Sequence, residues 1–62
     1  MMATAPPAYV LLDDQDGRRH AIRRQAIIGL VEDPSATTTL LLSGGRMIVV
    51  NEDLGTTLAM IA

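Results

Sequence analysis

Between residues 8 and 50, short runs of apolar and β-branched residues alternate with turn-forming residues at regular spacing. Runs of this kind favour β-strands. The pairs Asp16-Gly17 and Gly44-Gly45 favour tight hairpin turns, and Asp33-Pro34-Ser35-Ala36 favours a four-residue turn. The sequence therefore predicts a mainly β fold. We expect an antiparallel meander of five strands over residues 8–14, 18–23, 27–32, 37–42 and 46–50, with an irregular corner at 23–26.

The two glycine turns also predict how the strands pair. A two-residue turn at Asp16-Gly17 places acidic residues opposite basic ones and apolar residues opposite apolar ones, as expected of a stable hairpin. It pairs Gln15 with Arg18, Asp14 with Arg19, Asp13 with His20, Leu12 with Ala21 and Leu11 with Ile22. A two-residue turn at Gly44-Gly45 pairs Ser43 with Arg46, Leu42 with Met47, Leu41 with Ile48 and Leu40 with Val49.

The two ends of the chain follow other patterns. Leu54, Leu58 and Ile61 are spaced as on one face of a helix. Asn51 is a good N-cap residue, and two acidic residues follow it where the helix dipole favours negative charge. We therefore predict a short C-terminal helix capped by Asn51. Residues 1–7 contain two adjacent prolines and are expected to form a flexible leader, so the single domain covers residues 8–62.

Three of the predicted strands are apolar on both faces, whereas a sheet with one solvated face alternates between apolar and polar residues. The runs are 10–12, 40–42 and 48–50. The C-terminal helix can cover only part of one face, so the second face is expected to contact another molecule. The residues expected at this oligomer interface are Leu11, Leu41, Ile48, Val49 and Leu58.

Composition supports this expectation and excludes several classes of protein. The chain has 62 residues, a net charge of −2, one tyrosine and no cysteine, tryptophan or phenylalanine, so disulfides and thiol chemistry are impossible. It has neither a long apolar run nor the basic start of a secretory signal, so no membrane contact and a cytoplasmic location are expected. Hydrophobic residues make up 48% of this small chain. We therefore expect a homo-oligomer that hides apolar surface between copies.

The candidate chemistry is sparse, and a non-enzymatic protein without cofactor or metal is expected. His20 is the only histidine; with Asp13 it could contribute to a metal site, but an exposed ion pair on a hairpin is the favoured interpretation. Ser43 lacks the context of a nucleophile and is interpreted as a turn residue. Gly44-Gly45-Arg46 lacks the spacing of a phosphate loop. The acidic residues at 13, 14 and 16 lack the glycine and glutamate positions of a calcium loop.

Arginines are dense between residues 18 and 24, and they provide an alternative function. Repeated around an oligomer, they could form a basic belt that binds RNA or DNA. Strand alternation divides them between two faces, and facing aspartates neutralise them, so a solvated, ion-paired hairpin is favoured. A cavity between subunits that holds a small anion is a third possibility. The candidate residues for nucleic-acid or anion binding are Arg18, Arg19, Arg23, Arg24 and Arg46.

The order of these features resembles the FlbD family of small bacterial flagellar and swarming-motility proteins. The shared features are the turn at Asp16-Gly17, the turn with Pro34, the second turn at Gly44-Gly45, the valine pair at 49–50 and Glu52 at the start of the helix. The resemblance covers residues 9–61, although Arg23 and Ser35-Ala36 depart from the family pattern. The resemblance implies a non-enzymatic accessory or regulatory protein built on a small sheet. The small size is also typical of phage proteins, so a bacterial or phage origin is expected, and the expected partner is the protein itself or another protein. The outline is also similar, in less detail, to ring-forming RNA binders of the Sm type.

Overall fold

The computed structural model describes residues 8–62, so the leader predicted for residues 1–7 lies outside the described residues. The described part contains five strands, one 3-10 turn and one α-helix. In chain order these are β1 (Tyr9–Asp13), β2 (Arg19–Arg23), η1 (Arg24–Ala26), β3 (Ile27–Glu32), β4 (Thr38–Leu42), β5 (Arg46–Val50) and α1 (Leu54–Ile61). The predicted mainly β fold with a short C-terminal helix is confirmed.

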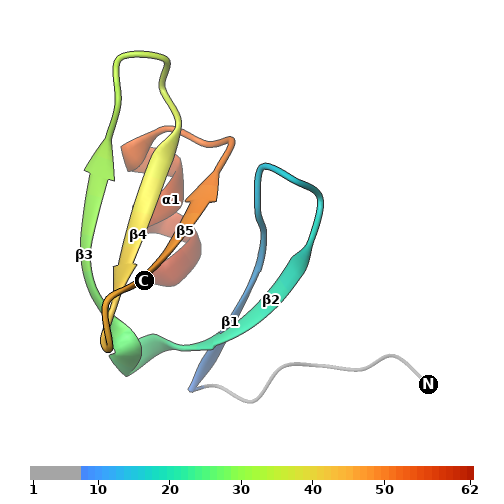
Figure 1. Ribbon diagram of the computed structural model, residues 1–62, viewed down its shortest axis with the longest axis vertical. Coiled ribbons are helices and arrows are strands. Elements are labelled where there is room, and N and C mark those ends of the chain that lie inside the picture. Colours follow the sequence, from blue (N-terminus) through green and yellow to red (C-terminus); the bar gives the residue numbers. More distant parts are fainter. Residues whose placement is uncertain (1–7) are drawn as a thin grey trace.

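The strands form two antiparallel sheets, a β1–β2 hairpin and a three-stranded sheet in the order β3–β4–β5. The hairpin lies beside β5, and η1 leads from β2 to β3 at the opposite edge of the larger sheet (Figure 1). The irregular corner expected between the second and third strands is this 3-10 turn. Because η1 redirects the chain there, β2 and β3 do not pair, and the meander is divided into two sheets.

The predicted pairing of the first hairpin is wrong by one residue. Asp13 lies opposite Arg19, and His20 lies opposite Leu12. The Asp14 N–H donates to the Arg18 carbonyl (2.8 Å) and the Gly17 N–H donates to the Asp14 carbonyl (3.0 Å), so three residues form the loop. Gly17 has φ +82°, which is the left-handed residue of a type I turn followed by a bulge. The extra loop residue shifts every pair.

The second hairpin departs from prediction in the same way. Leu41 pairs with Met47, and Leu40 pairs with Ile48, because the loop contains Ser43 as well as the two glycines. The turn between β3 and β4 is the predicted four-residue turn, closed by the Ala36 N–H donating to the Asp33 carbonyl (3.0 Å). These loops determine which residues of β4 and β5 face the core.

The core lies between the inner face of the β3–β4–β5 sheet and the structures packed on it. Its buried apolar side chains come from the first hairpin and from β4 and β5: Val10, Leu12, Ile22, Leu40, Leu42, Ile48 and Val50. Helix α1 lies behind the sheet in the view of Figure 1, so the helix and the hairpin share the covering of this face. The inner face is therefore closed by the chain's own elements.

The helix begins two residues later than predicted. Asp53, and not Asn51, is the N-cap: its Oδ1 accepts a hydrogen bond from the Thr56 N–H (2.7 Å). Thr57 is completely buried, and its hydroxyl donates to the Asp53 carbonyl (2.8 Å). Ile61 packs against the core. Leu58 was expected on the apolar face, but 49% of its surface is exposed, so Thr57 takes the place predicted for it.

Candidate interaction surface

The outer face of the β3–β4–β5 sheet carries two cross-strand rows of largely apolar residues. The first row contains Gly29, Leu41 and Met47, and the second contains Val31, Thr39 and Val49. We call Val31, Leu41, Met47 and Val49 the outer patch. Met47 is 67% exposed and Val31 is 53% exposed, while Leu41 and Val49 are half-buried.

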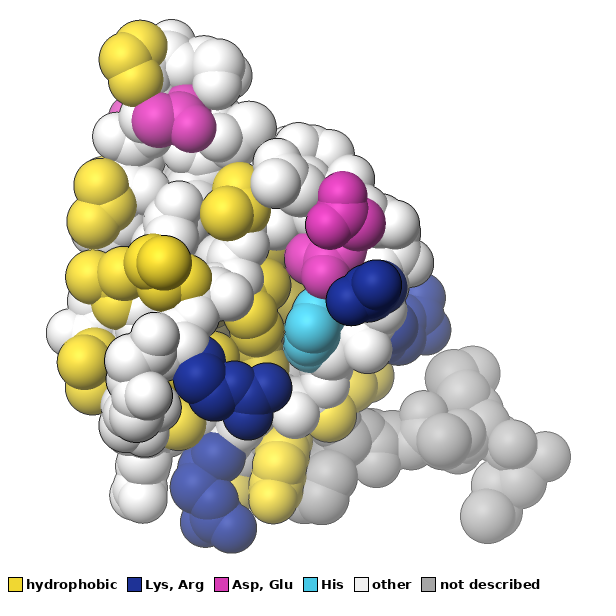
Figure 2. Space-filling view, viewed as in Figure 1, with side chains coloured by type: hydrophobic (Ala, Val, Ile, Leu, Met, Phe, Trp, Pro, Cys, Tyr) yellow, Lys and Arg dark blue, Asp and Glu magenta, His cyan; other side chains and the backbone are white. Residues whose placement is uncertain are grey.

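Leu41 and Met47 are direct cross-strand neighbours, Thr39 lies between Val31 and Val49, and residues of β3 extend the outer patch at its edge. A Cβ on Gly29 would lie 3.4 Å from Leu41 Cδ1, so the leucine side chain leans over the glycine. Ile28, at the bulge in β3, adds a further side chain that is 69% exposed. Hydrophobic side chains gather over β3–β5 on the side away from α1 (Figure 2). Elements of the described chain cover the inner face, and this apolar surface remains open.

The structure does not bring the five predicted interface residues together. Leu41 and Val49 lie in the outer patch, but Ile48 points inward and belongs to the core. Leu11 is 48% exposed on the first hairpin, and Leu58 is exposed on α1. The prediction of Ile48 is wrong because it rested on a register in which Ile48 faces Leu41. The same one-residue error concealed Met47, whose side chain takes that place.

A second feature is an ion pair and a side-chain hydrogen bond near the tip of the first hairpin. Arg19 Nε lies 3.1 Å from Asp13 Oδ1, and His20 Nε2 lies 2.8 Å from Asp14 Oδ2. The predicted partner of His20 was Asp13, so that pairing is wrong. Asp14 Oδ1 also accepts from the backbone N–H of Arg18 (2.9 Å). The hydrogen bond from His20 and those from the loop lower the pKa of Asp14, because all of them stabilise its charged form.

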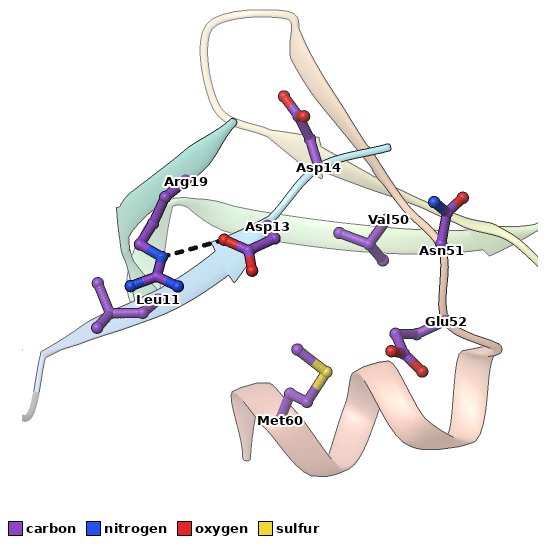
Figure 3. Close-up of a pocket in the computed structure, with 8 residues that line it drawn as sticks. All are labelled: Leu11, Asp13, Asp14, Arg19, Val50, Asn51, Glu52 and Met60. Atoms are coloured by element: carbon purple, nitrogen blue, oxygen red, sulfur yellow. Dashed lines mark hydrogen bonds and ion pairs between the residues drawn. The ribbon is translucent and has the colours of Figure 1, made fainter. Parts of the chain in front are cut away.

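A hollow of about 430 Å³ lies between the first hairpin, the segment that follows β5 and the last turn of α1 (Figure 3). Asp13, Asp14 and Glu52 line it, together with Met60 from the helix. The Asp13 carboxylate points toward Arg19 in this view. Among residues 8–62, no three histidine or carboxylate side chains are grouped closely enough to hold a metal ion. Of the polar groups that line the hollow, Asp13, Asp14 and Arg19 make their side-chain contacts within the hairpin.

The five candidate arginines do not form one patch. Arg19 is paired with Asp13, and Arg24 Nε donates to the Ile61 carbonyl at the end of α1 (2.7 Å). Arg18 lies at the loop of the first hairpin. Arg23 and Arg46 are the two that share a surface, because both line a groove between β2 and β5. The structure therefore places the four arginines of residues 18–24 in four different surroundings.

Comparison of the chain with models of protein families, with curated proteins and with solved structures finds no match. The resemblance to the FlbD family therefore stays a prediction. Among the described residues, α1 is the only α-helix, and its eight residues are too few to cross a lipid bilayer.

Proposed function

We propose that this protein is a non-enzymatic interaction module that associates with a second copy of itself through the outer patch. The observation that supports this most directly is the contrast between the two faces of one sheet. The inner face is closed by the hairpin and α1, whereas the outer face presents Met47 and Val31 more than half exposed. Two-fold pairing would bring one outer patch against another and remove both from water.

The size of the patch sets the expected strength of association. Three strands of five or six residues span an area of about 14 by 17 to 20 Å, given the usual strand spacing and rise. This is well below the roughly 800 Å² per partner that a standard stable interface buries. The apolar gain must also exceed the entropic cost of association. We therefore expect a reversible dimer whose population depends strongly on concentration.

We also propose that the protein is not an enzyme. This part of the proposal rests on the contacts that the histidine and its aspartate partner make. The only histidine is hydrogen-bonded to Asp14, whose other carboxylate oxygen holds backbone N–H groups of the loop. Both side chains therefore form hydrogen bonds that stabilise the hairpin. The resemblance to the FlbD family adds a regulatory role, which self-association could serve by changing the surface available to a partner.

The proposal is tested by sedimentation equilibrium from about 10 µM to about 1 mM, the range in which weak dimers form. We expect the apparent mass of the parent to rise toward twice the monomer. Met47→Lys and Val31→Lys should stay monomeric over this range with unchanged far-UV circular dichroism, because a lysine ammonium in the dimer interface would lose its hydration.

Leu58→Lys is the matched control, since it places the same charge on an exposed leucine of α1, outside the outer patch. We expect it to associate as the parent does. A parent that remains monomeric at the highest concentration would contradict the proposal. Equal association of the Met47→Lys variant would place the interface elsewhere.

A further inference from the structure

A groove of about 270 Å³ separates β2 from β5 and is independent of the outer patch. Its floor is apolar, with Ile22, Leu42 and Ile48 among its lining residues. Its titratable side chains are His20, Arg23 and Arg46, and no carboxylate lines it. Basic side chains lie between the sheet and the hairpin (Figure 2). In a chain of net charge −2, this segregation of charge favours an anionic ligand.

The two arginines of the groove are available to a ligand in different ways. Arg46 is exposed, and its guanidinium has no hydrogen bond or ion pair with the described residues. Arg23 lies over the Tyr9 ring, 5.4 Å from its centroid, and its Nη2 is 3.5 Å from the tyrosine hydroxyl. This contact orients Arg23 without neutralising its charge. Two guanidinium groups thus border one groove whose lining is partly apolar.

Both strands that border the groove have unpaired edges there. Val49 accepts a hydrogen bond from the Gln15 N–H (2.8 Å), which shows that its backbone groups point away from β4. Because backbone direction alternates along a strand, the N–H and carbonyl of Met47 point the same way. On β2, the Arg24 N–H donates to Ala8 across the hairpin (2.7 Å). By the same alternation, Ala21 and Arg23 direct their backbone groups away from β1.

We propose that this groove binds an extended acidic peptide segment, which adds as a short strand beside Met47, on the part of the β5 edge that the hydrogen bond from Gln15 to Val49 leaves open. The backbone of the peptide would pair with Met47 and Ala21, as in other cases of strand addition. A carboxylate side chain of the peptide would reach Arg46 and Arg23, whose forked guanidinium groups suit bidentate contacts.

The groove suits a peptide better than a nucleic acid for two reasons. Single-stranded nucleic acids are bound largely by stacking of bases on aromatic rings. The chain has one tyrosine, and the face of its ring is already occupied by Arg23. In addition, strand edges offer alternating donors and acceptors, which match a peptide backbone and not a phosphate chain.

The experiment is fluorescence anisotropy with the labelled peptide Gly-Thr-Val-Glu-Val-Thr-Gly, measured on the Val31→Lys variant so that failure of the dimer proposal cannot affect the result. We expect saturable binding that weakens about tenfold or more with Arg46→Ala, as expected for loss of a charge-assisted hydrogen bond. Arg19→Ala, which removes an arginine outside the groove, is the matched control and should bind as the starting variant does.

Two further comparisons test the mode of binding. A peptide with Gln in place of Glu should bind about tenfold more weakly, and amide NMR signals of Met47 and Ala21 should shift when the acidic peptide is added. Equal affinity for the Glu and Gln peptides would overturn the proposal, as would equal binding by Arg46→Ala. Binding of labelled oligothymidine without binding of the peptide would assign the groove to nucleic acid and would also overturn it.

Discussion

Asp33 shows how one exposed carboxylate can organise a turn. Its Oδ1 accepts hydrogen bonds from the Ser35 N–H (2.9 Å) and the Ser35 hydroxyl (2.7 Å), and Oδ2 accepts one from the Thr37 hydroxyl. These bonds favour the charged carboxylate, those from the Ser35 and Thr37 hydroxyls most, and lower the pKa of Asp33 to about 2. The residue therefore links the conformation of the β3–β4 turn to pH.

We predict that part of the fold's stability is lost on acidification because of Asp33. Its folded pKa lies below the value of about 3.9 for an unfolded chain, so its contribution is complete above that value. The contribution is lost as the pH falls toward about 2. Thermal unfolding followed by circular dichroism between these limits should show a smaller pH dependence for Asp33→Asn than for the parent.

Asp16→Asn is the control for this prediction. Its side chain makes no hydrogen bond to another described residue, so this variant loses a carboxylate while the hydrogen bonds of the β3–β4 turn stay in place. The same slope of melting temperature against pH in the parent and in Asp33→Asn would show that the turn does not depend on this carboxylate.

At the level of elements, each of the three hairpin loops requires a residue in the left-handed conformation. Each ends on a residue with positive φ: Gly17 at +82°, Ala36 at +64° and Gly45 at +78°. Glycine adopts this conformation without penalty, whereas the Cβ of an alanine approaches the following carbonyl oxygen. The β3–β4 turn therefore contains local strain that the other two loops avoid.

We predict that Ala36→Gly raises the free energy of unfolding by about 0.5 to 1 kcal/mol, because relief of the left-handed strain exceeds the entropy cost of glycine. Ala36→Val should lower it, since a β-branched residue tolerates positive φ poorly. Urea denaturation followed by circular dichroism measures both changes. A glycine variant that is less stable than the parent would show that the turn does not retain this conformation in solution.

At the level of the whole molecule, the fold depends on the docking of the first hairpin onto the larger sheet. Val10, Leu12 and Ile22 enter the common core, and the backbone bond from Gln15 to Val49 joins the hairpin tip to β5. Without the hairpin, Leu40 and Ile48 would lose part of their covering. A domain of this size buries little surface beyond what stability requires.

We predict that Leu12→Ala lowers the free energy of unfolding by about 2 to 5 kcal/mol, the usual cost of removing a fully buried leucine side chain. Leu11→Ala, the neighbouring position on the exposed side of the same strand, should cost about 1 kcal/mol or less. Urea denaturation of the two variants side by side measures the difference. Equal losses would mean that the hairpin is not docked through Leu12.

Local pattern determined the secondary structure of this protein. The apolar runs, the glycine pairs and the Pro34 turn were sufficient to predict five antiparallel strands and a terminal helix, because strand propensity and turn chemistry act over a few residues. The expectation of an open apolar face came from the same runs. A sheet that is apolar on both faces needs more cover than one short helix provides.

Tertiary structure decided which residues occupy each face. One additional residue in a loop moves every side chain of a strand to the other face, so Ile48 lies in the core and Met47 in the outer patch. Asp-Gly and Gly-Gly sequences are compatible with loops of two or three residues. Only packing of the hairpin and α1 on the inner face distinguishes between them, because it selects the register that buries Leu12, Leu40 and Ile48 together.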